Sequence, residues 1–185
     1  MASILKGQSG QPIQFETVPN VNGDDVLTTV DTARILQIQT SIVTTTAVYS
    51  SVKYTPDVCT LEITPKSDNS KFFITFQFSG SSGQSGVYAT LFMDGQLISE
   101  ITPNSVGSRR VIYVGGDNTA NGVIFAGGTS FLLDNLNSET KTFSIRLTHN
   151  VSSTATVYLN RTVGDGDTAG SQRGVTSITI MEIEQ

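Results

Sequence analysis

Residues 71–80 read KFFITFQFSG, and the period of this segment decides the class of fold. Phe72, Ile74, Phe76 and Phe78 stand at every second position, with mostly polar residues between them. Successive side chains of a β-strand point to opposite faces, so the segment is predicted to be a strand with one buried face.

The same two-residue period recurs along the chain from about residue 34. Strands are also predicted at residues 33–40, 41–52, 58–64, 86–94, 96–101, 109–114, 122–126, 130–133, 141–149, 154–160 and 176–184. Clusters of Gly, Asn, Asp and Ser separate them, and Asp94-Gly95 is typical of a type I′ hairpin turn, which needs positive φ at both central residues. Many short strands with such turns indicate an antiparallel β-sandwich or barrel.

Two of these segments, 86–94 and 109–114, carry apolar residues on both faces. Either they are central strands, or their outer faces pack against another subunit. Longer polar loops are predicted at 79–86, 115–122 and 163–173.

Residues 1–33 have a different character from the domain predicted for residues 34–185. They contain two prolines and only scattered apolar residues, too few to fold on themselves, so we expect an extended N-terminal arm. Within residues 24–36, the apolar spacing fits either a short helix or a strand.

Composition excludes several classes of protein. The formal net charge of −5 argues against nucleic-acid binding, which needs a basic face. No apolar run is long enough to cross a membrane, and the N-terminus lacks the apolar core of a signal peptide. The single cysteine excludes an intramolecular disulfide.

Catalytic groups are scarce, since the chain has one His and one Cys. His149 is predicted to cap the end of a strand or to face solvent. Cys59 alternates with Leu61 and Ile63 and is predicted to be a buried, inert thiol. Arg109, Arg110, Arg161 and Arg173 fit either ordinary surface and turn positions or a patch for an anionic ligand.

Acidic residues near the predicted loops could in principle form a pair of catalytic carboxylates. The candidates are Asp117, Asp134, Asp165 and Asp167. Their spacing fixes no separation, so turn residues are the favoured interpretation.

The segment GDGDTAG, residues 164–170, offers two carboxylates to a cation. Asp165 and Asp167 are candidate metal ligands, but the segment lacks the further acceptors and the distal Glu of a calcium loop. Asn150 and Asn160 begin glycosylation sequons that we expect to be accidental. We predict no catalytic residue, no cofactor and no metal site.

Three segments resemble a group of bacteriophage virion proteins, the tail-fibre and head-fibre β-domains of marine and cyanobacterial phages. Residues 58–80, VCTLEITPKSDNSKFFITFQFSG, are similar to its strand, Ile-Thr-Pro, Ser/Asn-rich turn and second strand. GSRRVIYVG at 107–115 is similar to its Ser-Arg segment. VYLNRTVGDGDTAGSQRGVTSITIMEIEQ at 157–185 resembles its Asn-Arg pair, Gly/Asp loop and closing Ile-Thr-x-Met-Glu-Ile.

The resemblance implies a jelly-roll-like β-sandwich that assembles as a homotrimer on the outer surface of the virion. We therefore expect a non-enzymatic fibre or adhesion component, attached to other virion proteins through residues 1–33, with a host-surface glycan as a possible contact. A head decoration protein and a glycan-binding module are the alternatives.

Overall fold

The computed structural model describes residues 34–51, 53–83, 86–104, 111–117, 123–135 and 137–184, which all belong to one compact unit, Ala33–Gln185. The predicted arm, residues 1–33, lies outside the described residues, as do Arg109 and Arg110. Regular structure in the described residues is a 3₁₀-helix at Ser99–Ile101 and the strands β1 (Ile35–Val43), β2 (Ala47–Ser51), β3 (Cys59–Ile63), β4 (Ser70–Ser82), β5 (Val87–Met93), β6 (Gln96–Leu97), β7 (Val114–Gly116), β8 (Phe125–Asn135), β9 (Lys141–Thr148), β10 (Ala155–Leu159) and β11 (Thr176–Glu184).

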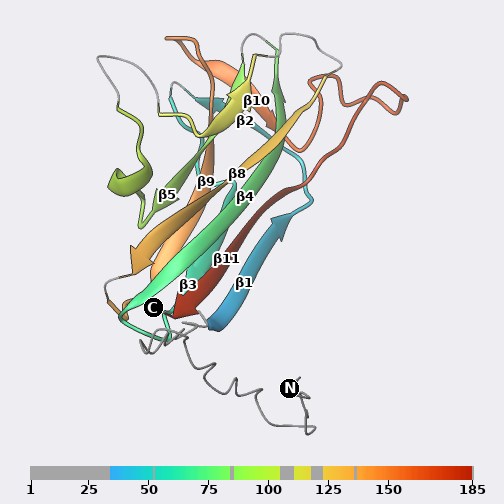
Figure 1. Cartoon of the computed structure of the whole chain (residues 1–185). Coiled ribbons are helices and arrows are strands. Elements are labelled where there is room, and N and C mark those ends of the chain that lie inside the picture. Colours follow the sequence, from blue (N-terminus) through green and yellow to red (C-terminus); the bar gives the residue numbers. More distant parts are fainter. Residues whose placement is uncertain are drawn as a thin grey trace, which may run out of the picture. The chain divides into compact units, whose positions relative to one another are not determined.

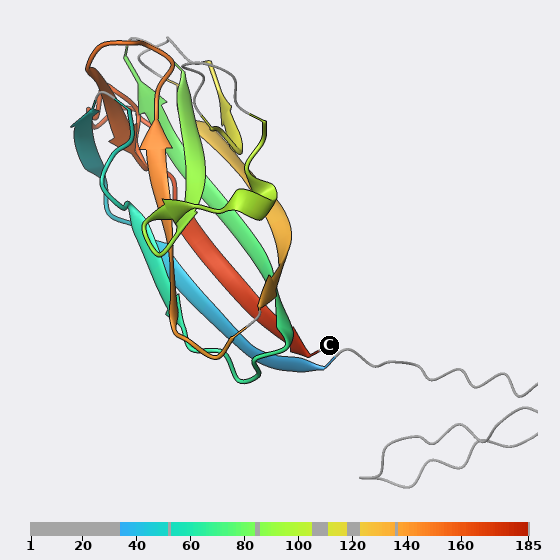
Figure 2. The same cartoon turned by 90° about the vertical axis from the view of Figure 1, so that its left-hand side faces the viewer.

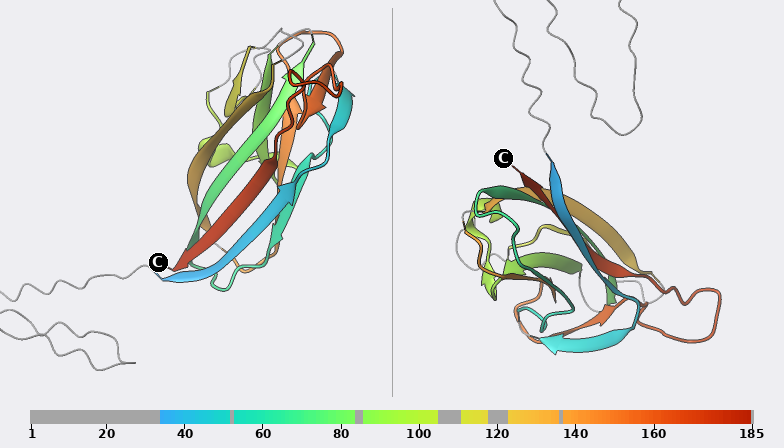
Figure 3. Two further views of the ribbon diagram at one scale, coloured as in Figure 1. Left: turned by 90° about the vertical axis from the view of Figure 1, so that its right-hand side faces the viewer. Right: turned by 90° about the horizontal axis from the view of Figure 1, so that it is seen from below.

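The strands form two antiparallel sheets, so the predicted all-β sandwich is confirmed (Figure 1). The first sheet has the order β1-β11-β4-β10-β2. β11 and then β10 pair along one edge of β4, and β8 pairs along its opposite edge. The second has the order β3-β9-β5-β6, with β7 beside β5. Figure 2 shows the second sheet toward the viewer, and the right view of Figure 3 shows the layers from one end.

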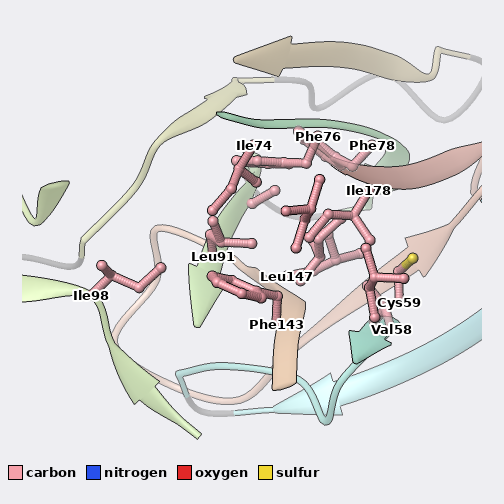
Figure 4. Packing of buried hydrophobic residues seen from close by; sticks show 14 of the residues in the cluster. Val58, Cys59, Ile74, Phe76, Phe78, Leu91, Ile98, Phe143, Leu147 and Ile178 are labelled. Atoms are coloured by element: carbon pink, nitrogen blue, oxygen red, sulfur yellow. The ribbon is translucent and has the colours of Figure 1, made fainter. Parts of the chain in front are cut away.

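The core lies between the sheets and follows the predicted alternation of β4. Phe72, Ile74, Phe76 and Phe78 are buried, and Figure 4 shows the last three among the side chains of the opposing sheet. Phe72 meets Phe143 of β9 edge to face, with the ring centroids 5.9 Å apart. Since each such side chain contributes roughly 1.5–3 kcal/mol on full burial, this alternation is a main source of stability.

The predicted hairpin turn is confirmed at Asp94-Gly95. The φ angles are +50° and +76°, and β5 pairs with β6 on either side. Asp94 also accepts a 2.8 Å hydrogen bond from the backbone N–H of Thr142, which fixes the turn to the start of β9.

Other boundaries differ from the prediction. The strand predicted at 130–133 and residues 125 and 126 of the one predicted at 122–126 belong to one strand, β8, which Gly127 and Gly128 continue. A Cβ at Gly128 would lie 2.6 Å from the carbonyl oxygen of Phe76, so this glycine permits close pairing with β4. Ser79–Ser82 also belong to a strand, β4, where a loop was predicted.

Candidate functional site

The C-terminal strand carries a buried carboxylate that ties two distant segments together. Glu182 is fully buried and accepts hydrogen bonds from the backbone N–H groups of Lys66 and Ser67, the Ser70 hydroxyl and the Gln37 amide, at 2.7–3.1 Å. Burial alone would raise the pKa of Glu182, but these hydrogen bonds outweigh it and lower that pKa. The role of this residue is to hold the 64–70 turn against the end of β11.

A second buried polar cluster surrounds Asn160, which has φ +54°. Its amide donates to the carbonyl oxygens of Val43 and Thr45 at 2.8 and 3.0 Å, and its carbonyl accepts from the Thr176 hydroxyl at 2.8 Å. Asn160 therefore joins the ends of β1, β10 and β11, and its burial leaves it no room for a glycan.

Asp165, a candidate metal ligand, is occupied by two arginines. Arg161 lies 2.7 Å and Arg173 2.8 Å from its carboxylate oxygens. The Arg161 guanidinium also lies 5.0 Å from the ring centroid of Tyr158. Asp167 is exposed on the same loop. This arrangement closes the 163–173 loop, so the two described arginines of the candidate anion patch, Arg161 and Arg173, are both paired with Asp165.

His149 and Cys59 do not meet. His149 directly follows β9 and is fully buried, so of the two predicted settings solvent exposure is wrong. Its Nε2 lies 2.8 Å from the carbonyl oxygen of Ser51. Cys59 is buried as predicted, and burial raises the pKa of its thiol, which lowers its reactivity.

The remaining acidic candidates lie near opposite ends of the sandwich. Asp134, near the end of β8, is 3.5 Å from Lys71 Nζ. Asp117 follows β7, whose partner residue Val87 lies beside Gly80 at the far end of β4. In the described part of the chain, no three His, Cys, Asp or Glu residues are grouped to hold a metal ion. The same residues include no helix long and apolar enough to span a membrane.

Asp117 belongs to a polar cluster that sequence reasoning did not assemble. It accepts hydrogen bonds from the Tyr88 hydroxyl and from the Asn150 amide, the latter at 3.0 Å. Burial, the hydrogen bond to Asp117 and the charge of that carboxylate raise the pKa of Tyr88 to about 12. The cluster presents a carboxylate, an amide and an aromatic ring close together.

The outer face of β5, in the second sheet, is covered by the chain itself. Phe92 of β5 is buried under Tyr54, whose ring centroid is 5.3 Å away, and under the guanidinium of Arg146, 4.2 Å from its ring. Arg146 is held there by Asp57 at 2.6 Å. Residues 86–94 were predicted to be either a central strand or a strand covered by another subunit. The first alternative holds, because β5 is a central strand whose outer face is covered within the chain.

The outer face of β1, β11, β4 and β8, by contrast, is bare of described segments (Figure 1; Figure 3, left). We define it as the side chains of these strands that point away from the second sheet. The pairing register arranges them in rows at right angles to the strands. The apolar row is Ile38, Met181, Phe73 and Leu132; the hydroxyl row is Thr40, Thr179, Thr75 and Ser130; the mixed row is Ile42, Ser177, Gln77 and Gly128; and the end row is Ile35, Ile183, Lys71 and Asp134.

Three of these rows carry no charge, and the end row carries one ion pair. Ile38 is 53% exposed, Ile42 61% and Leu132 54%. In the hydroxyl row, Thr40 bonds Thr179 at 3.0 Å and Thr75 bonds Ser130 at 3.1 Å. A regular surface that carries little charge and exposes large apolar side chains is typical of a protein interface.

An open hollow of about 370 Å³ adjoins the mixed row. Its lining is Gln77, Phe78, Ser79, Ala126, Gly127, Gly128 and Val175. Gly128 and Ala126 fill little space there, so the hollow extends the outer face.

No protein-family model matches the chain, and no curated protein matches its sequence. The assignment of a function therefore depends on the chain's own residues and geometry.

Proposed function

We propose that the chain is a structural protein on the outer surface of a bacteriophage particle, a homotrimeric fibre or adhesion component attached through residues 1–33. The observation that carries the proposal is the outer face of β1, β11, β4 and β8, which leaves an apolar row uncovered across four strands. A chain that leaves such an apolar row exposed gains stability when assembly buries it, as in subunits of a particle.

The position of Glu182 supports the resemblance on which the virion assignment rests. Glu182 lies in the Met-Glu-Ile ending, and its hydrogen-bond donors Lys66, Ser67 and Ser70 lie in the turn after Ile-Thr-Pro. Two of the separate resembling segments thus form one structural unit. We also propose that the two sheets form a jelly roll, and their antiparallel strands support this.

The proposal assigns no catalysis. Asp134 is paired with Lys71, and Asp165 with Arg161 and Arg173, which supports a structural role for these carboxylates. The protein is expected to act by binding and assembly.

Labelling of purified phage particles with a gold-tagged antibody to this chain tests the proposal by electron microscopy. Label at the tail would support a fibre or adhesion component. Label around the head would replace it with the alternative, a decoration protein of the capsid. Intact particles without label, from a lysate that contains the chain, would refute the virion assignment.

A second candidate, a glycan-binding module, is favoured by the cluster of Tyr88, Asp117 and Asn150. A carboxylate and an amide can bind neighbouring sugar hydroxyls, and an aromatic ring can pack against the sugar. A glycan array should give signals that Asp117→Ala abolishes and Asp134→Ala leaves unchanged. An array without hits would remove this candidate.

A further inference from the structure

We propose that neighbouring copies of this chain cover the outer face, and that they meet in parallel, each row lying at the level of the same row of the next copy. The inference deepens the proposed homotrimer and rests on it. It names the surface by which the copies associate and their relative direction.

The first argument concerns the direction of the side chains of β1. A strand at the edge of a core usually turns its apolar residues inward and its polar residues outward, and most of β1 does the opposite. Three of its inward positions, Gln37, Gln39 and Ser41, are polar. Gln37 bonds Glu182 at 2.7 Å and Ser41 lies 3.7 Å from the Cys59 sulfur, whereas inward Val43 packs against the core. Its apolar residues Ile38 and Ile42 point outward and are more than half exposed. Folding of a single copy gains little from these isoleucines, whereas association buries them.

The second argument is the chemistry of the rows, which favours parallel copies. A rotation axis along the strands keeps every row at its own level, so that apolar side chains meet apolar ones and hydroxyls meet hydroxyls. A two-fold axis along the hydroxyl row would instead place the apolar row over the mixed row, where Gln77 and Ser177 would lose water without matched partners. Parallel copies bury the face with fewer unpaired polar groups.

The third argument comes from the sheet edges. Among the described strands, β1 pairs only with β11 and β8 only with β4, so each has one free edge. β1 contains no charged residue and no proline, and β8 contains one charge, Asp134. Exposed strand edges normally carry such protection, and a rotational assembly covers these edges by placing β1 of one copy near β8 of the next.

The area of the face is consistent with this arrangement. Four strands spaced about 4.8 Å apart and nine residues of about 3.3 Å each give a flat area of roughly 570 Å² per copy. In a trimer each copy divides this face between two neighbours, and a standard interface buries about 800 Å² per partner, so the face supplies part of each interface and the free edges add to it. A ring that closes also leaves no apolar face for open-ended growth.

The oligomeric state of the full chain, measured by light scattering after gel filtration, tests the surface. Leu132→Asp should weaken association by about a hundredfold or more, because it places an unpaired charge in the interface. Val48→Asp is the matched control, since Val48 is 52% exposed on β2, outside the four rows, and should assemble as the wild type does. A monomeric wild type, or a Leu132→Asp variant that assembles normally, would overturn the inference.

Disulfide cross-linking tests the direction. Thr40 and Ser130 lie in one row but three strand spacings apart, roughly 14 Å within one copy, too far for an internal disulfide. The double variant Thr40→Cys/Ser130→Cys should form disulfide-linked oligomers, and Thr40→Cys/Ala126→Cys, two rows out of level, should not. Equal cross-linking by Thr40→Cys alone would indicate antiparallel copies and would overturn the parallel arrangement.

These outcomes are separable from those of particle labelling. An oligomer with the expected cross-link but no label on particles would leave this inference standing and refute the virion assignment. Label on particles with no effect of Leu132→Asp on assembly would support the virion assignment and refute this inference.

Discussion

Glu182 provides a sharp test of how the chain closes its fold. The substitution Glu182→Gln keeps the size of the side chain but replaces one acceptor oxygen by an amide that cannot accept. At least one buried donor, the Ser70 hydroxyl or a backbone N–H of the 66–67 turn, then loses its partner. Losing hydrogen bonds to a buried charged group costs about 1.5–3 kcal/mol each, and water can reach exposed Lys66, so we expect a loss of about 2–4 kcal/mol.

The matched control lies two residues along the same strand. Glu184 pairs with Arg34 at 3.1 Å, and both side chains are largely exposed. Glu184→Gln should therefore change the free energy of unfolding by less than about 1 kcal/mol. Urea denaturation of both variants beside the wild type gives the difference directly, provided that the m values agree.

The pH dependence of the free energy of unfolding distinguishes the contribution of the Glu182 charge from that of its side-chain shape. Because the pKa of folded Glu182 lies below its ordinary value of 4.5, its contribution is complete above pH 4.5 and is lost as the pH falls through the folded pKa. The gap between wild type and Glu182→Gln should shrink over that acidic range. Equal stability of the two glutamine variants at pH 7, or a gap that stays constant into acid, would refute the reasoning.

Three further results are expected. Asn160→Ala should lower the free energy of unfolding by about 3 kcal/mol in thermal or urea unfolding, since it leaves the Thr176 hydroxyl without its acceptor and places alanine at positive φ. Asn160→Gly should recover the backbone part of that loss, about 1 kcal/mol. Asp165→Asn should make the 163–173 loop more sensitive to limited proteolysis, because two arginines lose their ion pair, whereas Asp167→Asn should leave the digestion pattern unchanged. In a spectrophotometric titration, Tyr88 should ionise near pH 12. The free energy of unfolding should fall between about pH 10 and 12, because the raised pKa of Tyr88 favours the neutral phenol in the folded state. Identical titrations of the wild type and a Tyr88→Phe variant above pH 11 would contradict this.

The strands could be predicted where one face is buried and one is solvated. In β4, β9 and β10 the alternating apolar residues point into the core, apart from Phe73 of β4, so the period in the sequence and the direction in the structure coincide. The Asp94-Gly95 turn was predictable for the same local reason, since the residue types alone meet the demand for positive φ.

Glycine-rich segments could not be interpreted in this way. Gly127 and Gly128 look like a turn in the sequence, yet they lie within β8. A side chain at Gly128 would meet the backbone of β4, and one at Gly127 would meet the side chains of Phe125 and Val114. The buried contacts of Asn160 and Glu182 were equally out of reach, because each joins segments more than a hundred residues apart.

The outer face was missed for a deeper reason. Alternation identifies the two faces of a strand but not which one meets the core, and the prediction assumed that apolar residues point inward. In β1 the register with β11 decides otherwise, since the irregularity between Ile35 and Gln37 sets the parity that turns Ile38 outward. The segment singled out for a second apolar face, 86–94, covers that face with Tyr54 and Arg146 of its own chain. The outer face of β5 is thus covered by internal segments while that of β1 keeps its isoleucines exposed, and this asymmetry supports the proposed association of copies through one face.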